Sequence, residues 1–263
     1  MDLVQRDVDI AIFLTVRQDP RRLPLYGLTH ALHTALVCHL MGQRMGWEGP
    51  QARSLVKAAL TMNLGITELQ GRMAATGRIT DVQREQVRQH PQFAFDRLSA
   101  AGVADVTWLE AVLQHHERSG GSGYPAKCAA PSEWAVALRM ADVFMAKISA
   151  RCDRPPLTVQ DAARQMFAEA RGNPAAAAII KEYGIYPPGN AVMLASGELA
   201  VVIRRGASAV TPLAAAITDK AGMPTLGTAR RDTSQPTFAI KAVATDLSLV
   251  QRVPAERLYG LAE

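Results

Sequence analysis

Apolar positions in the first two thirds of the chain recur at the spacing of α-helices. Over residues 29–45, apolar side chains at i+3, i+4, i+7 and i+8 extend one stripe from His33 to Met41. The pattern therefore predicts a helix that carries His33 on its buried face. His30 lies one turn before His33 and His39 falls off this stripe, and we expect both at the surface or behind a site formed by other residues.

Similar patterns predict seven more helical segments before residue 185. Thr80 and Gln83 have the spacing of a capping box, and Pro91 is expected to end that helix at His90. The segments are predicted near 1–18, 50–62, 80–90, 103–116, 131–149, 158–167 and 174–183. Short loops between so many helices favour a mainly α bundle.

The pattern changes at Gly184. Two apolar runs flank a Ser196-Gly197 turn, as in a β-hairpin. Strands are predicted over 191–195, 198–203, 211–217 and 237–243. We therefore expect an N-terminal helical lead-in over 1–27, a helical domain over 28–183 and a small β-rich C-terminal subdomain over 184–263.

Composition narrows the classes of function. The 263 residues are 48% apolar and 20% charged, which indicates a globular protein with a substantial core. The net charge of +5 comes from scattered basic residues and only 5% are aromatic, so a small anionic ligand is favoured over DNA or RNA. No run is long enough to span a membrane, the start lacks a signal-peptide pattern, and the three cysteines form no CxxC pair. These features predict a cytoplasmic protein.

Five residues are candidate metal ligands. Adjacent histidines end an apolar helix just before a loop with three glycines in four residues. A buried imidazole without a partner costs a few kcal/mol, about 1 to 3 in proteins, so histidines on buried stripes must bind a metal or each other. The candidates are His33, His90, His115, His116 and Asp142. Two simpler interpretations stay open: a capping imidazole at the helix end, and an Asp142 carboxylate paired with Arg139.

Motifs spread over residues 28–185 resemble the HD-GYP family of metal-dependent phosphohydrolases. They are His33, His90-Pro91, His115-His116-Glu117, Gly121-Ser122-Gly123-Tyr124-Pro125, Ala141-Asp142-Val143-Phe144 and Ser149-x-Arg151. The resemblance implies an HD-type helical fold that hydrolyses the bacterial second messenger cyclic di-GMP with two or three metal ions, often iron or manganese. It also implies that Gly123, Tyr124, Pro125, Arg151 and Arg154 contact the nucleotide.

The chain departs from this family at its namesake dyad. The histidine and aspartate of the dyad should lie about 29 residues after His33, where this chain has Met62-Asn63, and the family's Gly-Lys is Gly65-Ile66. Two divalent ions about 4 Å apart repel by roughly 17 kcal/mol at an effective dielectric of 20, so a dinuclear site needs an anion between them. Neutral Asn63 supplies none, and we expect one divalent metal, such as iron or manganese, or none.

The resulting hypothesis is a degenerate HD-GYP protein of bacterial cyclic di-GMP signalling. It would bind cyclic di-GMP or a related nucleotide, or dock with other signalling proteins, with little or no hydrolysis. The alternative is a metal-dependent cyclic di-GMP phosphodiesterase that works with an incomplete metal site. In a third hypothesis, the β-rich subdomain carries the function and the helical domain only supports it structurally.

Overall fold

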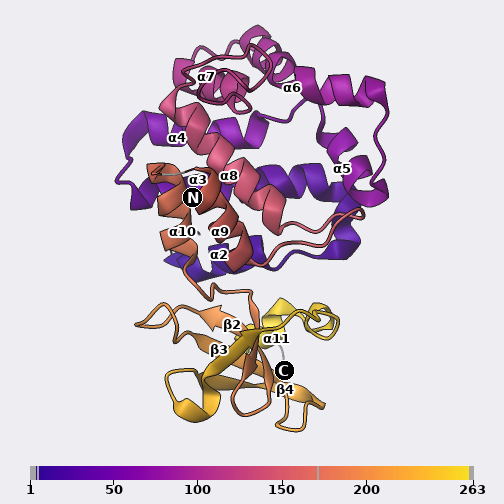
Figure 1. Ribbon diagram of the computed structural model, residues 1–263, viewed down its shortest axis with the longest axis vertical. Helices are drawn as coiled ribbons and strands as arrows, with labels where there is room; N and C mark the ends of the chain where they lie inside the picture. Colours follow the sequence, from indigo (N-terminus) through magenta and orange to yellow (C-terminus); the bar gives the residue numbers. More distant parts are fainter. Residues whose placement is uncertain (1–3, 5, 171, 261–263) are drawn as a thin grey trace. The chain divides into compact units, whose positions relative to one another are not determined.

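The chain forms two compact units in the computed structural model, which describes residues 4, 6–170 and 172–260 (Figure 1). One unit is Pro20–Glu182, and the other combines Met1–Asp19 with Tyr183–Glu263. The segment predicted as a single lead-in over 1–27 is thus divided at Asp19. Within the described ranges, no helix combines the length and apolar character required to cross a membrane.

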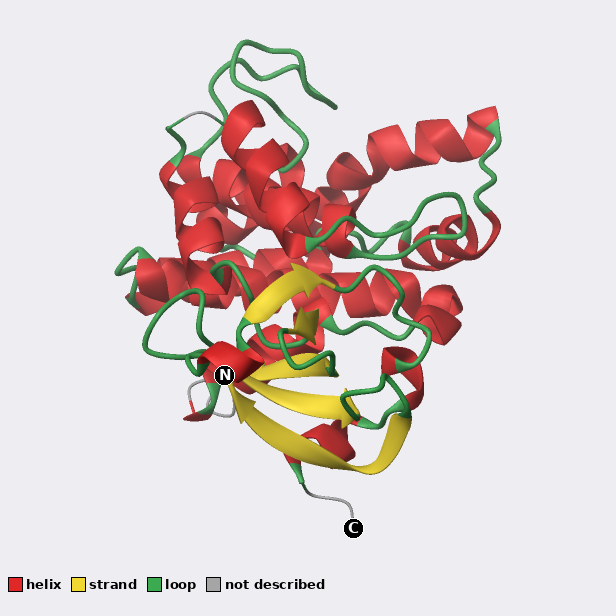
Figure 2. Cartoon of the chain, turned by 60° about the horizontal axis from the view of Figure 1, so that its bottom comes forward, coloured by secondary structure: helices red, strands yellow, loops and turns green. Residues whose placement is uncertain are grey.

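The unit over Pro20–Glu182, which we call the helical unit, is built largely from α-helices (Figure 2). They are α3 (Tyr26–Arg44), α4 (Gly49–Thr61), α5 (Thr67–Thr76), α6 (Asp81–Ala100), α7 (Val106–Gln114), α8 (Glu133–Ile148), α9 (Val159–Glu169) and α10 (Pro174–Tyr183), after a 3-10 segment η1 (Pro20–Leu25). Helix α3 packs against α4, α5 and α8, while α7 packs against α4, α6 and α8. The mainly α architecture is as predicted.

Helix caps lie close to their predicted positions. The Thr80 side chain accepts a hydrogen bond from the Gln83 backbone N–H, and the Gln83 side chain accepts from Thr80, which completes the capping box. At the starts of α8 and α9, the Ser132 and Thr158 side chains each accept from the backbone N–H three residues later. Helix α5 was not predicted, because its mixed sequence shows little periodic apolar signal.

The prediction that Pro91 ends its helix was wrong, because α6 continues ten residues further to Ala100. Proline removes the N–H that would bond to the carbonyl four residues earlier, which here belongs to Val87. The His90 ring takes its place, since His90 Nδ1 lies 2.6 Å from the Val87 oxygen. The carbonyl is satisfied, and the helix continues.

The second unit, which we call the β unit, is a five-stranded antiparallel sheet in the order β4-β3-β2-β1-β5. Its strands are β1 (Ala191–Leu194), β2 (Leu199–Arg204), β3 (Leu213–Thr218), β4 (Pro224–Asp232) and β5 (Ile240–Val243). The Ser196-Gly197 turn joins β1 and β2 in register, with Ala191 opposite Val201. Edge strand β4 was not predicted, because its exposed, polar sequence lacks a buried face.

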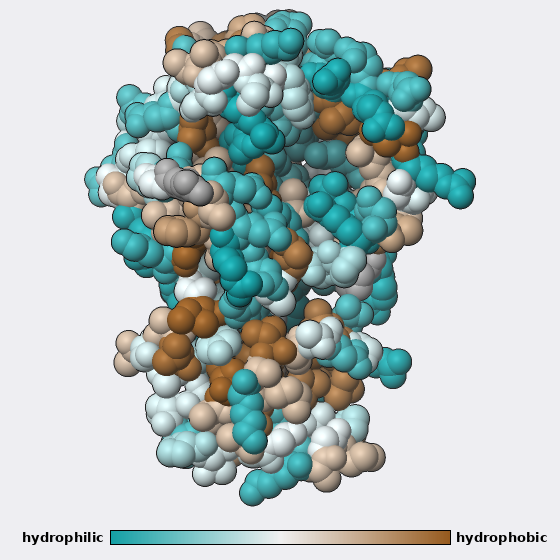
Figure 3. All heavy atoms as spheres, in the orientation of Figure 1, coloured by the Kyte–Doolittle hydropathy of each residue, from teal (hydrophilic) through white to brown (hydrophobic). Residues whose placement is uncertain are grey.

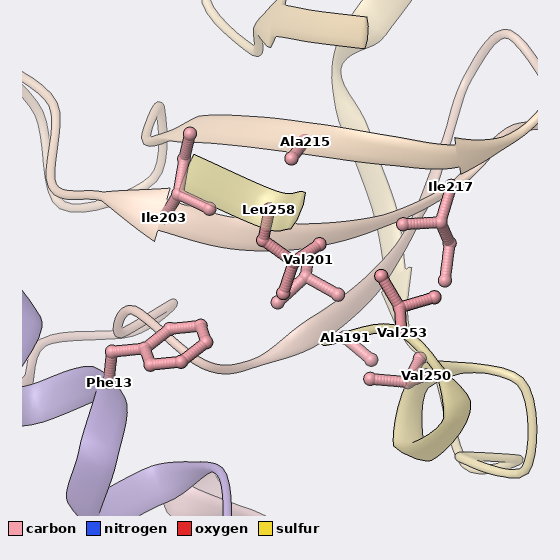
Figure 4. Close-up of a cluster of buried hydrophobic side chains, with 9 residues drawn as sticks. All are labelled: Phe13, Ala191, Val201, Ile203, Ala215, Ile217, Val250, Val253 and Leu258. Carbon is pink, nitrogen blue, oxygen red and sulfur yellow. The ribbon is translucent and has the colours of Figure 1, made fainter. Parts of the chain in front are cut away.

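The core of the β unit includes the first described helix, α2 (Val8–Val16). Phe13 of α2 lies edge-on to Tyr259, with ring centroids 5.2 Å apart, and packs with side chains of β1, β2 and β3 (Figure 4). Asp9 pairs with Arg205 at the end of β2, and Thr15 shares a 2.7 Å hydrogen bond with Tyr183. Contacts from both ends of the chain therefore build this unit.

Short 3-10 turns η2 (Pro236–Phe238) and η3 (Val250–Arg252) and the helix α11 (Ala255–Tyr259) complete the β unit. On the face shown in Figure 3, the helical unit is mostly hydrophilic, and its apolar side chains are scattered. Isolated apolar side chains of this kind are ordinary on a protein surface.

Candidate metal site

On α6, the His90 ring is oriented by its hydrogen bond to the Val87 carbonyl, the same carbonyl that Pro91 leaves without a backbone donor. A carbonyl oxygen only accepts hydrogen bonds, so His90 Nδ1 carries the proton that it donates to Val87. In the neutral ring, Nε2 then carries no proton and has a lone pair that can bind a metal. Burial, together with the nearby His115, lowers the pKa of His90 to about 3, which keeps the ring neutral.

His115 is fixed in the same tautomer at the end of α7. The helix stops at Gln114, and the His115 Nδ1 donates to the carbonyl of Val112 at 2.7 Å. His115 is completely buried, and burial lowers its pKa. His116 follows outside the helix, which lets both adjacent histidines face one site, and burial lowers its pKa well below the ordinary value.

The three imidazoles form one cluster that fits a divalent cation. Ligand nitrogens of His90, His115 and His116 lie within 4.8 Å of one another. The Nε2 atoms of His90 and His115, each with a lone pair, are only 3.1 Å apart. Two nitrogens that each lie about 2.1 Å from one ion at octahedral or tetrahedral angles are about 3.0 to 3.4 Å apart. The cluster, predicted in part from the adjacent histidines, therefore has the donor set of a metal site.

His30, not His33, reaches Asp142. The His30 Nε2 lies 2.7 Å from the Asp142 carboxylate, and His30 is only 3% exposed. His30 was expected at the surface or behind a site formed by other residues, and the first of these alternatives was wrong. Burial opposes ionisation of Asp142, but the hydrogen bond and charge of His30 outweigh it and lower the pKa of the carboxyl. Asp142 forms no ion pair with Arg139 within the described residues.

His33 is half-buried, and its Nδ1 has no hydrogen-bond partner. Burial and the charge of His30 lower the pKa of His33 to about 4. The structure therefore does not bring His33 to the three-imidazole cluster or to Asp142 by any hydrogen bond within the described ranges.

Tyr26 and Arg151 extend the His30–Asp142 pair into a chain of polar groups. The Arg151 guanidinium donates to the Tyr26 hydroxyl at 2.8 Å, and that hydroxyl lies 3.3 Å from His30 Nδ1. The hydroxyl therefore links the Arg151 guanidinium to the His30 ring, whose Nε2 faces Asp142. Arg151 also lies over the Tyr26 ring, 5.0 Å from its centroid. Tyr26 was not predicted, although the four-residue spacing to His30 is a signal for it.

The loop after α7 is held by a buried carboxylate. Glu117 is 1% exposed, and its two oxygens accept hydrogen bonds from the backbone N–H groups of Ala126 at 2.7 Å and Cys128 at 3.0 Å. A Cβ on Gly123 would lie 2.4 Å from the Glu117 Cα, so only glycine allows this close approach. The Tyr124 ring then stacks on His116, with centroids 4.6 Å apart. Of the predicted loop residues, Tyr124 thus lies against the histidine cluster.

The residues that replace the family's dyad are buried in the helical unit. Met62 caps the C-terminus of α4 and is fully buried, and Asn63 is 4% exposed. Neither side chain carries charge. Arg154, predicted to contact nucleotide with Arg151, donates to the backbone carbonyl of Ala146 at 2.6 Å.

The helical unit thus holds the imidazole cluster and the histidine–aspartate pair. The HD domain model matches residues 19–173. The chain therefore belongs to the HD domain family.

Two curated relatives carry the comparison further. The cyclic di-GMP phosphodiesterase PA4108 of Pseudomonas aeruginosa is 31% identical over 69% of this chain and 46% of its own length. The cyclic di-GMP phosphodiesterase response regulator RpfG of Xanthomonas campestris pv. campestris is 30% identical over 51% of this chain and 36% of its own length. The chain thus spans less than half the length of these relatives. These matches confirm the predicted resemblance to the HD-GYP family.

One solved structure is also similar: Bd1817, a HDG"Y"P protein from Bdellovibrio bacteriovorus. It is 15% identical, with a TM-score of 0.49 over 59% of this chain and 51% of that chain. A likeness this distant adds nothing to the sequence matches.

Proposed function

We propose that this protein binds cyclic di-GMP, or a related nucleotide, in bacterial signalling and hydrolyses it poorly or not at all. The observation that carries the proposal is a retained three-imidazole cluster in a chain whose two dyad positions have lost their charge. The names of the two curated relatives supply the ligand.

The remaining charges argue against a dinuclear centre. Two divalent ions about 4 Å apart repel by roughly 17 kcal/mol at an effective dielectric of 20. Asp142 is engaged by His30, and Asn63 offers a neutral oxygen where the family has a bridging carboxylate. His90, His115 and His116 would therefore hold a single ion, which supplies a positive charge for a phosphate but no hydroxide bridged by two metals.

Calorimetric titration with cyclic di-GMP tests the binding half of the proposal. Purified protein should release or absorb heat with a dissociation constant in the micromolar range or below. Absence of binding at ligand concentrations of about a hundred micromolar, corresponding to roughly 5 kcal/mol of binding energy, contradicts it.

A double substitution tests the lost chemistry. Restoring the dyad with Met62→His and Asn63→Asp together should raise the metal content from one ion towards two and produce hydrolysis of cyclic di-GMP. The single substitution Met62→His is the matched control, because it adds a ligand without the bridging charge. Turnover by the unaltered protein that equals that of the double variant would refute the claim that the dyad limits activity.

The alternative is a weak phosphodiesterase with one metal, which the imidazole cluster favours. It predicts slow turnover that disappears with His115→Ala, although Met62 and Asn63 are unchanged. Metal analysis and product chromatography on the same samples separate the two functions.

A further inference from the structure

His116 is the member of the histidine cluster whose ring is held by no hydrogen bond across the described ranges. The Nδ1 atoms of His90 and His115 donate to backbone carbonyls at 2.6 and 2.7 Å, and both residues are buried. His116 is partly exposed. A ligand imidazole is normally oriented by a hydrogen bond from its second ring nitrogen. His116 therefore needs another support to keep the orientation of a ligand.

Ring contacts supply that support. The centroids of the His116 and Tyr124 rings are 4.6 Å apart and their planes differ by 22°, which is a stacked arrangement. His115 lies 4.2 Å from His116 at a tilt of 42°, and His90 lies 5.0 Å away and nearly perpendicular. Among these neighbours of the His116 ring, Tyr124 is the one that does not itself belong to the cluster.

The position of Tyr124 is fixed by the backbone on both sides of it. The Tyr124 N–H donates to the His116 carbonyl at 3.3 Å, so the two residues are joined by the backbone as well as by their rings. A Cβ on Gly123 would lie 2.5 Å from the same His116 oxygen, so this approach requires glycine. Beyond Tyr124, the Glu117 carboxylate accepts from the Ala126 N–H at 2.7 Å. The loop thus carries the Tyr124 ring to a defined place.

A stacked ring can restrict His116 as the carbonyls restrict the other two imidazoles. Rotation of the His116 ring about its bond to Cβ would separate the two planes, so the stack favours orientations near the present one. A side chain that is already ordered loses less rotamer freedom when it binds an ion. Another flat ring in place of Tyr124 would preserve this effect, whereas a branched aliphatic side chain would not.

We propose that Tyr124 is a positioning residue of the metal site. Its ring, carried by the loop that Glu117 holds, orients His116 for a divalent ion shared with His90 and His115. This inference rests on the proposed function, because it concerns the same single-ion site. It gives Tyr124 a role towards the metal ligands, whereas the sequence resemblance implied a contact with the nucleotide.

Titration of the full chain with Co²⁺, whose visible absorption depends on its ligands, tests the proposal. Tyr124→Leu should weaken Co²⁺ binding about tenfold and change the absorption spectrum, as expected when a residue that orients a metal ligand is lost. Tyr124→Phe keeps the flat ring and should bind within about twofold of the unaltered protein. Ser122→Ala, at an exposed position of the same loop, is the matched control. Circular dichroism must show that each variant is folded.

A second measurement needs no metal. With isotope-labelled histidine and a chelator present, nuclear magnetic resonance reports the ring nitrogens of His116, which are assigned by comparison with His116→Gln. Their signals should change in Tyr124→Leu and be retained in Tyr124→Phe.

Failure of this inference and failure of the proposed function give different results. If the unaltered protein binds Co²⁺ and Tyr124→Leu binds it with the same affinity and spectrum, the positioning role is overturned, even if that variant no longer binds cyclic di-GMP. If the unaltered protein binds no Co²⁺, the proposed single-ion site fails, and the resonance spectra decide whether Tyr124 orients His116. His116 signals that are the same in Tyr124→Leu and in the unaltered protein overturn that role.

Discussion

Replacing His30 should destabilise the helical unit far more than replacing His33 one turn away. His30→Ala removes the hydrogen bond to Asp142 and leaves a carboxylate whose side chain is only 13% exposed. Removing one partner of a buried ion pair costs about 3 to 5 kcal/mol, and the partial exposure of Asp142 reduces this to about 2 to 4 kcal/mol. His33→Ala removes a half-buried ring with an unpartnered Nδ1, so we expect a loss of less than about 1 kcal/mol.

Tryptophan fluorescence during urea unfolding measures this difference in stability for the helical unit. The three tryptophans, Trp47, Trp108 and Trp134, all lie within the helical unit. With a slope of about 2 to 3 kcal/mol/M, His30→Ala should lower the midpoint by about 1 M. A chelator keeps metal binding out of the comparison. Equal losses for the two variants, or a shift below about 0.3 M for His30→Ala, would refute the assigned pair.

The pH dependence of the same measurement gives a second check. The folded-state pKa of Asp142 is lowered, so its ionised form stabilises the fold above the pKa of an unfolded aspartate, about 3.9. This contribution is lost as the pH falls. The difference between the unaltered protein and His30→Ala should therefore be full at pH 7 and shrink below about pH 4.

Three further predictions concern the supports of the site and the β unit. Tyr26→Phe removes the hydroxyl between Arg151 and His30 and should cost about 1 to 2 kcal/mol in the same fluorescence assay; an unchanged midpoint would contradict it. Glu117→Gln leaves at least one loop N–H without its acceptor and should speed tryptic cleavage after Lys127 several-fold, with unchanged cleavage as the contrary result. Phe13→Ala, at a position 2% exposed, should cost about 3 kcal/mol, seen as faster hydrogen exchange in β2, whereas the half-exposed neighbour Leu14→Ala should cost less than about 0.5.

The sequence predicted the cluster of His90, His115 and His116 better than it predicted their neighbours. Adjacent histidines before a glycine loop are a local signal, and the helix end that lets both face one site could be read from the glycines. The contacts of Nδ1 in His90 and His115 depend on backbone carbonyls in three dimensions, which no sequence pattern specifies.

His33 was predicted to be the buried histidine of this helix, whereas His30 is, and this error has a specific cause. The buried positions of α3 begin at Tyr26 and continue through His30 and Thr34. Two of these three residues are polar, so a count of apolar side chains finds the stripe that starts at His33 instead. Positions three residues apart lie only about 60° apart around a helix, and their sequence spacing alone does not decide which one points inward.

The fold was predicted where elements have strong periodic or turn signals. The β1–β2 hairpin follows from its two-residue turn, and α8 follows from a capping serine and a continuous apolar stripe. Strand β4 lies at an edge of the sheet, so only its pairing with β3 identifies it as a strand. The contact of Phe13 with Tyr259 joins residues almost a full chain length apart, and it has no local signature.

The pairing of His90 with Pro91 has a consequence for how the chain can vary. A substitution such as Pro91→Ala would return an amide hydrogen to the backbone, and that amide would compete with the imidazole for the one oxygen of Val87. The His90 ring could then rotate or move its proton from Nδ1 to Nε2. The cluster would lose the lone pair on His90 Nε2, although His90, His115 and His116 themselves are unchanged. Pro91, which interrupts the backbone hydrogen bonds of the helix, thereby keeps the His90 ring in the orientation and tautomer of the cluster.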